Sequence, residues 1–554
     1  MKPVKGLLYS QIGYEPDWPM RALVRGQDAS LLSESAGFKI LESGKEVTGG
    51  PVVHWGVKWG THWWIADFSS LREEGQFIIV ILDGGSEKFR SEEFPVRRNI
   101  LWDRTWKMVA LEQNERRFHL AMNRVGWQDC GAAWQEANSH AALVDGFCEL
   151  LEYSRGRISA DELKRLEAQI VNGLDYLSLL QDHAAKLGLG EGALSHQKPK
   201  YEEFVLPADV SKASMVWAKA SRLLSKNHST KKEEYLKRAV KAFDWLRTAR
   251  PLRTGFSHVN HGAPRDFKIP EEFMTRDLLM SCLAAYELVR CGRNEYKEDA
   301  VSLARKVMSR QIPREKSEDD FYGHFRTFDS SGLSEKAWVH NVDKNELGMD
   351  AGGHYPYYLI PLIRMSETWP EHPDAEAWRQ TIEDFAYGYF LPACRANPFL
   401  ILPLGHFKGI GLLWFSGLWH GMNCVYLLSA VLAMEFERIF KDASFRDIAW
   451  GNIQWIAGLN AGLTAEGGKA AHMFSADVPE GLAQPVSMIH GIGAHFAGSY
   501  MNIRGSICNG FSTGEQFKFD IEPSIESDGP HTFTDEDWIT HSGAWLAALS
   551  RLGK

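Results

Sequence analysis

The sequence predicts a multidomain β + α protein, in which a small β-sandwich precedes a toroid of helical hairpins. Two observations lead to this prediction. In residues 1–97 short apolar runs alternate with turn signals, whereas in residues 98–554 apolar residues recur at helical spacing. In addition, a chain of 554 residues exceeds the size that one ordinary hydrophobic core supports. We therefore predict a β domain at 1–97 and a helical domain at 98–554.

The first 97 residues contain six or seven short segments that are typical of strands, for example Arg21–Val24, Phe38–Leu41 and Gln76–Ile81. Turn signals such as Gly49-Gly50-Pro51 separate them. Several short strands in so few residues favour two sheets packed face to face. Four tryptophans are expected to fill this core or to dock it on the next domain: Trp55, Trp59, Trp63 and Trp64.

The rest of the chain holds twelve segments with helical periodicity. Asp209 and Ser229 are plausible helix starts, and Gly188 and Gly292 are plausible ends. Twelve helices are too many for a simple bundle, so we predict six hairpins closed into an (α/α)6 toroid. The predicted helices lie near 100–123, 138–155, 159–187, 206–226, 230–250, 270–292, 294–311, 354–369, 372–397, 419–441, 444–460 and 535–552.

Composition excludes several classes of partner. The net charge of −9 argues against nucleic acid, and no apolar run is long enough to span a membrane. The seven cysteines are odd in number and show no disulfide or zinc spacing. No long apolar segment stands near residue 1, so we expect a cytoplasmic protein. A homodimer is compatible with the sequence.

The most distinctive segment is Gly126–Glu136, a glycine-containing loop before an apolar helix. It carries two indoles, Trp127 and Trp134, and two carboxylates, Asp129 and Glu136. Indoles can stack on a sugar while a carboxylate reaches its hydroxyls or a water. The alternative is an ordinary junction in which Asp129 caps a turn.

A second acidic segment, Asp535-Glu536-Asp537, precedes the last apolar helix. Acids at a helix N-terminus favour the helix dipole, which is one explanation. The functional explanation is that Glu536 is a general acid, because inverting glycoside hydrolysis needs two carboxyl groups about 6.5–9.5 Å apart. A toroid brings its first and last hairpins together, so we predict that Asp129 and Glu536 face each other.

Aromatic and histidine side chains in the long connections 188–205, 311–353 and 461–534 and at nearby helix ends suggest a sugar-binding cleft, although each taken alone is more often a core residue. The predicted substrate-binding residues are Trp127, Trp134, His354, Tyr355, Trp414, Trp419, His420 and His541. His258 and His261 could ligate a metal, but no third ligand is placed by spacing. We expect no metal and no other cofactor, and no ligand set indicates a structural calcium.

The segment Ser10–Ala22 resembles the opening of the immunoglobulin-like N-terminal domain of family 9 glycoside hydrolases. The segments Trp64–Ser69, Glu74–Phe77 and Ser91–Val96 continue this resemblance. In that family an α/α toroid follows the β domain. The resemblance therefore implies an immunoglobulin-like β-sandwich followed by a catalytic (α/α)6 toroid.

The same resemblance assigns roles within the two acidic segments. Asp535–Ile539 is similar to the family's Asn-Glu-x-x-Ile, which implies that Glu536 is the general acid. Gly126–Ala132 is similar to Gly-Trp-x-Asp-Ala-Gly-Asp, whose first Asp helps hold the attacking water and whose second Asp is the base. Asp129 matches the first, whereas Ala132 stands in place of the second. The family's His-His-Arg segment has no clear counterpart.

These observations predict an inverting glycoside hydrolase that acts on short β-linked oligosaccharides with a non-standard base. Glu536 is the predicted acid, and Asp129 or Glu136 is the predicted base-side residue. Two alternatives remain open. One is a polysaccharide-lyase-type or other reaction on the same toroid, using tyrosine and histidine, and the other is an inactive glycan-binding protein.

Overall fold

The structure is a computed structural model, and it describes most of the chain. The described residues are 6–26, 28–58, 61–130, 135–199, 202–250, 272–317, 319–326, 329, 359–403, 405–407, 411–413, 423–460, 487–493, 503–513 and 531–552. Within the short strands after residue 404, only part of the side chains is described.

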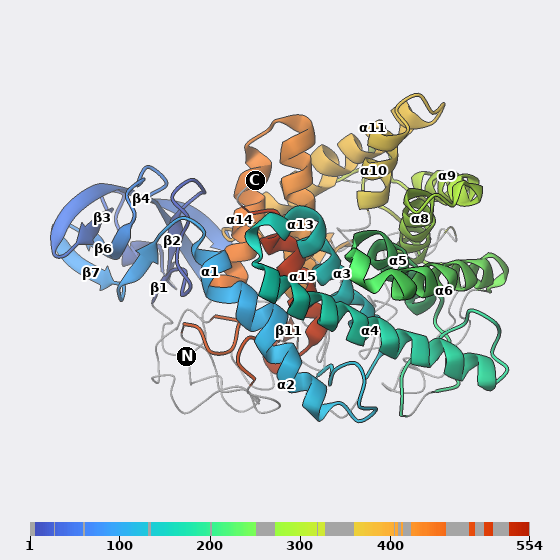
Figure 1. Cartoon of the computed structure of the whole chain (residues 1–554). Helices are drawn as coiled ribbons and strands as arrows, with labels where there is room; N and C mark the ends of the chain where they lie inside the picture. The colour runs from blue at the N-terminus through green and yellow to red at the C-terminus, as the bar shows by residue number, and fades with distance from the viewer. Residues whose placement is uncertain are drawn as a thin grey trace.

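The N-terminal part is an antiparallel β domain, which lies to one side of the helices (Figure 1). Its strand order is β1-β2-β5-β4-β3-β6-β7, and β8 pairs with β6. The long strand β4 pairs with β3 through its first half and with β5 through its second, so it connects the two layers. The strands are β1 (Gly6–Leu8), β2 (Arg21–Gly26), β3 (Gly37–Glu42), β4 (Lys45–Lys58), β5 (Thr61–Asp67), β6 (Gly75–Asp83), β7 (Ser86–Arg90) and β8 (Phe94–Val96).

The tryptophans of the β domain divide between its own core and its contact with the helices. Trp64 is buried inside the sandwich, whereas Trp63 belongs to the helical core and packs edge-on against Phe399 at 5.0 Å. Trp18 stacks on Trp450 with ring centroids 5.2 Å apart. The prediction that these indoles fill the core or dock the domain is therefore confirmed for Trp63 and Trp64, and Trp59 lies outside the described residues.

Among the helices of the described segments, six form an inner ring, and the others pack around it. Successive inner helices contact one another, and an ion pair between Arg364 and Glu435 joins α10 to α13. The inner helices are α3 (Ala137–Tyr153), α5 (Pro207–Leu223), α8 (Thr275–Arg290), α10 (Ile360–Thr368), α13 (Asn423–Phe440) and α15 (Ile539–Leu549). The outer helices are α1 (Ile100–Lys107), α2 (Gln113–Leu120), α4 (Ala160–Lys186), α6 (Ser229–Thr248), α9 (Lys297–Met308), α11 (Ala375–Phe385), α12 (Leu391–Arg395) and α14 (Ser444–Ala457).

Two outer helices are continued through π-helical turns. Met108–Glu112 joins α1 to α2, and Ala386–Phe390 joins α11 to α12. Each composite helix therefore counts as one outer member, and the predicted (α/α)6 toroid is confirmed. The last strand of the β domain ends at Val96 and α1 begins at Ile100, so the predicted boundary at residue 97 lies in the connection between them.

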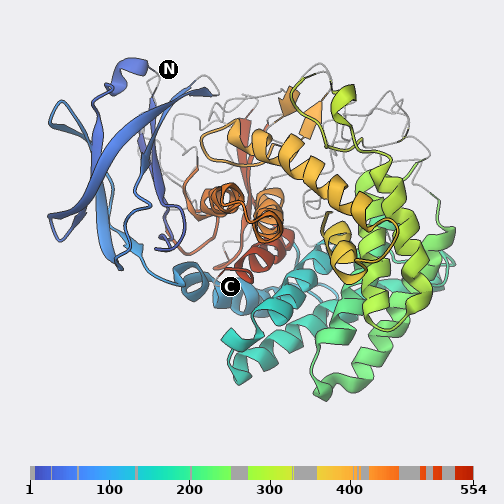
Figure 2. The same cartoon turned by 90° about the horizontal axis from the view of Figure 1, so that it is seen from above.

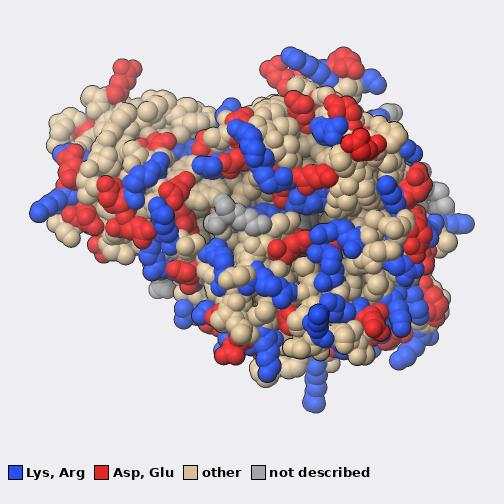
Figure 3. All heavy atoms as spheres, turned by 45° about the horizontal axis from the view of Figure 1, so that its top comes forward, with Lys and Arg blue, Asp and Glu red and all other residues tan. Residues whose placement is uncertain are grey.

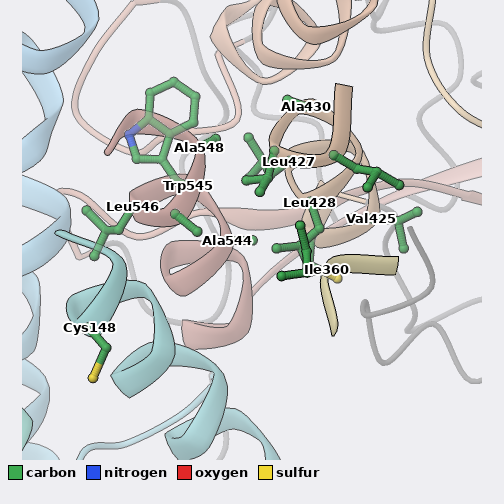
Figure 4. Packing of buried hydrophobic residues seen from close by; sticks show 14 of the residues in the cluster. Cys148, Ile360, Val425, Leu427, Leu428, Ala430, Ala544, Trp545, Leu546 and Ala548 are labelled. Atoms are coloured by element: carbon green, nitrogen blue, oxygen red, sulfur yellow. The ribbon is translucent and has the colours of Figure 1, made fainter. Parts of the chain in front are cut away.

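The first and last inner helices close the ring at a glycine-to-glycine crossing. A Cβ atom on Gly146 of α3 would lie 2.3 Å from the carbonyl oxygen of Gly543 of α15, and a Cβ on Gly543 would lie 2.2 Å from that of Ala142. Only glycine permits this approach of two backbones. Figure 2 shows α15 (red) beside the first helices (blue to teal), and Figure 4 shows apolar side chains of α13 and α15 packed together within the ring.

The segment before the last helix differs from the prediction. A helix was expected from about residue 535, but Asp535, Glu536 and Asp537 lie in strand β12 (His531–Asp537), and α15 begins at Ile539. Strand β12 pairs with β11 (Cys508–Thr513). Backbone pairing across this hairpin replaces the predicted first helical turn. A second hairpin joins β9 (Gly405–Phe407) to β10 (Gly411–Leu413).

Basic and acidic side chains are interspersed over the face of the molecule that Figure 3 shows. Among the described helices, none is both long enough and apolar enough to cross a lipid bilayer. All seven cysteines lie in described segments, and each is a free thiol.

Candidate active site

The predicted loop begins at Gly126, whose conformation requires glycine. Its φ is +71°, and a Cβ atom there would lie 2.6 Å from Nε2 of His140. Asn172 of α4 holds the same residue, because its side chain accepts from the Gly126 N–H at 3.0 Å and donates to the Gly126 carbonyl at 2.9 Å. The start of the loop is therefore attached to α4.

His140 of α3 fastens both ends of this loop. Its Nε2 accepts a hydrogen bond from the Trp127 N–H at 3.0 Å, and its Nδ1 donates to the Glu136 carbonyl at 2.7 Å. Because a backbone N–H can only donate and a carbonyl can only accept, the two contacts specify the neutral Nδ1–H tautomer. Burial lowers the pKa of His140 to about 4, in agreement with a neutral ring.

Trp127 is fully buried beneath the loop. Its ring stacks on His140 at 5.4 Å and packs edge-on against Phe147, and its Nε1 donates to Gln169 at 2.8 Å. In this position the indole supports the loop from the core side and has no exposed face on which a sugar could stack.

Asp129 is also buried, with 1% of its surface exposed. Its Oδ2 accepts hydrogen bonds from the backbone N–H of Glu136 at 2.7 Å and from Oγ of Ser139 at 2.9 Å. Burial and the negative charge of Glu136 raise the pKa of Asp129 well above its ordinary range, although hydrogen bonds from Glu136, Ser139 and Cys130 oppose the shift. Burial therefore favours the neutral, protonated form of Asp129.

The loop is joined directly to the start of α15. The Ile539 N–H donates to the carbonyl oxygen of Asp129 at 2.9 Å. Glu536 lies three residues before Ile539, and three residues of chain span at most about 10 Å. The backbone of Glu536 therefore lies near the Asp129 loop, as the predicted closure of the first and last hairpins requires.

A buried ion pair reinforces this junction. The Arg117 guanidinium of α2 contacts Oδ2 of Asp537 at 2.5 Å and donates to the carbonyl of Gln128 at 3.0 Å. Arg117 and Asp537 are both essentially inaccessible to solvent. One guanidinium thus connects the residue after Glu536 to the residue before Asp129. A π-helical turn precedes Arg117 in the same composite helix, and such turns are frequent at functional sites.

A second group of ionisable residues lies on the other side of Glu136. Nδ1 of His196 contacts Oδ2 of Asp209 at 2.7 Å, and Nε2 of His196 lies 3.8 Å from Oε1 of Glu136. His196 and Asp209 are buried, whereas 19% of the Glu136 side chain is exposed. Of the two carboxylates in the loop, Glu136 is therefore the one that a ligand can reach.

Comparisons with known proteins agree with this arrangement. The family model of the cellulase N-terminal ig-like domain matches residues 7–86. A metagenome-derived glycoside hydrolase family 9 endoglucanase superposes with a TM-score of 0.64 over 99% of this chain and 98% of that chain, at 16% identity. A GH9 protein from Bacteroides ovatus superposes with a TM-score of 0.61 over 98% of each chain, at 14% identity.

A third solved structure is AaCel9A in complex with a cellobiose-like isofagomine, with a TM-score of 0.55 over 99% of both chains at 13% identity. A search of curated proteins finds no match. These structures resemble this chain in both domains and in the order of the two domains. The chain has the fold of glycoside hydrolase family 9. Its immunoglobulin-like domain and its toroid are the two parts that the sequence predicted.

Within this family 9 fold, several predicted substrate-binding residues cannot be placed. Glu536 is described only by its backbone in β12. The residues outside the described part of the chain are Trp134, His354, Tyr355, Trp414, Trp419 and His420, together with Ala132, His258 and His261. Among the described residues, no group of three His, Cys, Asp or Glu side chains is arranged to hold a metal ion.

His541 is described, and it lies inside the family 9 toroid rather than on its surface. It is fully buried, and its Nε2 contacts Oδ1 of Asn509 at 2.7 Å. Its ring also packs edge-on against Trp538. In this position His541 attaches the start of α15 to strand β11. Its contacts are therefore those of a structural residue, whereas the sequence predicted a substrate-binding one.

Sequence reasoning did not find His196, Arg117 or Asp537 as site residues. His196 was part of a predicted cleft-wall segment, and Asp209 was predicted only as a helix start. No spacing pairs these residues with the loop at Gly126–Glu136, because the contacts arise between different hairpins of the toroid. An acidic residue in the first turn of α5 and a histidine thirteen positions earlier were the only local signals.

Proposed function

We propose that this protein is a glycoside hydrolase that cleaves short β-linked oligosaccharides with inversion of configuration. In this reaction Glu536 protonates the leaving oxygen, and a carboxylate in the Asp129–Glu136 loop takes the proton of the attacking water. The observation that carries the proposal is the hydrogen bond from the Ile539 N–H to the Asp129 carbonyl. It brings the two acidic segments to the same end of the toroid although about 400 residues separate them.

Two further observations support this assignment. The buried pair of Arg117 and Asp537 would hold Glu536 in place, because any shift of β12 would separate two desolvated charges. The inner helices α3, α5 and α15 all begin at this end of the ring, so their positive dipole ends lie near the acidic segments. Such an end favours ionised carboxylates and an oxygen that gains negative charge.

The solved relatives are consistent with a β-glucan or similar substrate. The first of them is an endoglucanase, and AaCel9A holds a cellobiose-like ligand. We infer that this chain takes a β-linked oligosaccharide, and that its sugar-binding subsites include aromatic side chains from the connections at this end of the toroid. A cytoplasmic location would fit action on imported oligosaccharides rather than on polymers.

The central test compares carboxylate-to-amide variants on a panel of neutral, amino and acidic β-linked oligosaccharides. In Glu536→Gln we expect kcat to fall by about 10²–10⁴-fold on natural oligosaccharides, because the leaving oxygen loses its proton donor. The loss should be much smaller on a nitrophenyl glycoside, whose leaving group needs no proton. Asp535→Asn, on the same strand, is the matched control and should retain activity.

The same panel separates the alternatives. Early product analysis by NMR should show the α-anomer, as inversion of a β-linkage requires. A rise in ultraviolet absorbance on acidic oligosaccharides would instead reveal an unsaturated product and a lyase. Binding by calorimetry with no product, unchanged in Glu536→Gln, would identify an inactive glycan-binding protein. Undiminished turnover of natural substrates by Glu536→Gln would contradict the proposed acid.

A further inference from the structure

The imidazole of His196 is buried between carboxylates from two different hairpins. Asp209 comes from the first turn of α5, and Glu136 immediately precedes α3. Backbone hydrogen bonds hold the histidine on both sides, since its N–H donates to the Phe204 carbonyl and its carbonyl accepts from the Ala137 N–H, each at 2.7 Å. The position of the ring relative to Glu136 is therefore set by backbone contacts as well as by side chains.

The contact with Asp209 gives this ring its charge. Asp209 is 2% exposed, and a buried carboxylate needs a partner that compensates its lost hydration. His196 supplies that partner through Nδ1 at 2.7 Å. Burial lowers the pKa of His196, but Asp209 and then Glu136 outweigh this effect and raise it to about 10.

The charge on His196 bears on the two carboxyl groups of the loop. The Glu136 N–H donates to Oδ2 of Asp129, and the negative charge of the Glu136 side chain raises the pKa of Asp129, so the two carboxyl groups do not both ionise readily. A cation 3.8 Å from Oε1 of Glu136 favours ionisation of Glu136 over Asp129. On the same face α5 also presents Lys212, whose Nζ contacts the Asn138 side chain of α3.

We propose that the Asp209–His196 pair is a positioning device that keeps Glu136 ionised and oriented, so that Glu136 replaces the base missing at Ala132. This inference rests on the proposed hydrolysis. In that step the water oxygen bonds to the anomeric carbon and its proton passes to the Glu136 carboxylate. The bond from the anomeric carbon to the leaving oxygen breaks, and Glu536 protonates that oxygen. Asp129 stays a neutral acid that helps to hold the loop.

The first experiment needs no substrate. In the full-length protein labelled with ¹⁵N-histidine, His196 is assigned by the signal lost in His196→Gln, and its titration is followed by NMR. We expect the imidazolium to persist above pH 8 in the wild type. Its titration midpoint should fall by about one to three pH units in Asp209→Asn and by a smaller amount in Glu136→Gln, because each variant removes one neighbouring negative charge. A wild-type midpoint near 6.5 overturns the proposal.

The second experiment measures the pH dependence of kcat/KM and kcat on an oligosaccharide that the wild type cleaves. In His196→Gln and Asp209→Asn we expect the acid limb to move to higher pH by about one to three units, since Glu136 loses the cation that favours its ionised form. KM should change little, because neither residue is assigned a contact with substrate. His183→Gln is the matched control, because His183 of α4 also contacts a carboxylate, but that of Glu202.

A third arm tests the role of Glu136 itself. Glu136→Gln should lose about 10²–10⁴ in kcat. Added azide should restore part of the turnover, because an anionic nucleophile needs no proton acceptor. An acid limb that keeps its wild-type position in both His196→Gln and Asp209→Asn, in folded protein by circular dichroism, would falsify the device. If no sugar is cleaved, the proposed function fails, and the NMR titration still decides whether Asp209 and His196 control the charge beside Glu136.

Discussion

Charged side chains are arranged differently at the two ends of the inner helix ring. At the C-terminal ends of the inner helices, six cations and six carboxylates form a set of ion pairs in two connected groups, which share α3 and α5 and together link all six helices. We call it the floor cluster. Its members are Lys219, Arg222, Arg290, Arg364, Arg438 and Arg551, with Asp145, Glu149, Glu152, Glu287, Glu367 and Glu435.

At the N-terminal ends of the same helices, ion pairs of Arg117 and His196 lie beside a loop that carries two acidic residues, Asp129 and Glu136. The backbone N–H of Glu136 donates to the Asp129 carboxyl group, and burial and the charge of Glu136 raise the pKa of Asp129. In the floor cluster burial also raises the pKa of Glu435, but Arg364 and Arg551 outweigh it and lower the pKa to about 2. The same helices thus carry paired charges at one end, and at the other end a buried carboxyl group whose neighbour raises its pKa.

This difference separates stability from function. Paired buried charges hold helices in register, because removing one partner leaves the other desolvated and alone. Two neighbouring carboxyl groups cost stability, but a group that burial keeps protonated leaves its neighbour to carry the negative charge and act as a proton acceptor. The comparison predicts that substitutions in the floor cluster change stability, and that substitutions around Asp129 change activity and pH dependence.

The largest effect on stability is expected from Arg364→Met. It removes the closest cation of buried Glu435, which keeps Arg438 and Arg551, and should lower the free energy of unfolding by about 1.5–3 kcal/mol. Denaturant unfolding measures this change, and the kcat of the remaining folded protein should stay at the wild-type value. Arg379→Met, which breaks an exposed pair with Glu376 on α11, is the control and should cost no more than about 1 kcal/mol. Equal losses in the two variants would remove the distinction between the floor cluster and ordinary surface pairs.

A second prediction concerns pH, and the two ends should respond in opposite directions. The folded-state pKa of Glu435 is depressed, so its contribution to stability is present above its ordinary pKa of 4.5 and is lost as the pH falls to about 2. The folded-state pKa of Asp129 is raised, so its contribution is present below its ordinary pKa of 3.8 and is lost as the pH rises through the folded-state value.

Unfolding midpoints measured across a pH series test this prediction. In Glu435→Gln, stability should fall less steeply than in the wild type as the pH is lowered. In Asp129→Asn, stability should fall less steeply than in the wild type as the pH is raised. Because an amide resembles a neutral carboxylic acid, Asp129→Asn should also be as stable as the wild type or more stable near neutral pH. If Asp129→Asn instead becomes progressively less stable than the wild type above pH 5, the carboxyl group is ionised in the folded protein and the proposed protonation is wrong.

The smallest effect is expected from Ser139→Ala. The change removes one hydrogen bond to Oδ2 of Asp129 and should cost about 1 kcal/mol of stability. This hydroxyl favours the ionised carboxylate, so its loss should raise the pKa of Asp129 further and leave Glu136 as base. Activity should therefore remain within about tenfold of the wild type. A collapse of kcat comparable to that of Glu136→Gln would mean that Asp129 must ionise during the reaction.

Much of the fold could be predicted because it depends on local patterns. Helical periodicity located every outer and inner helix of the described structure, and alternating apolar residues located β2, β3 and β6. The exception is the segment around Glu536, where three acids before an apolar run indicated a helix N-terminus. Pairing with β11 outweighs the helical propensity of this segment. The local sequence of Asp535–Asp537 does not indicate that a partner strand is present.

The candidate site was predicted less completely, and the reason lies in its construction. Asp129, Glu136 and Glu536 stood out because carboxylates in glycine- and tryptophan-containing segments are locally unusual. Trp127 stood out for the same reason, but its ring is buried against His140. The residues that set the charges, among them His196 and Arg117, belong to other hairpins, and sequence distance conceals their contacts.

By itself the sequence determined the order of domains, the twelve-helix pattern and the residue types available for acid–base chemistry. Periodicity and turn signals are local, so they survive without knowledge of contacts. Only the tertiary structure decided which carboxyl group is buried, which is reachable and which lies beside a cation. Those properties depend on desolvation and on distances of a few ångströms between α3, α5 and α15, and these quantities exist only after the ring has closed.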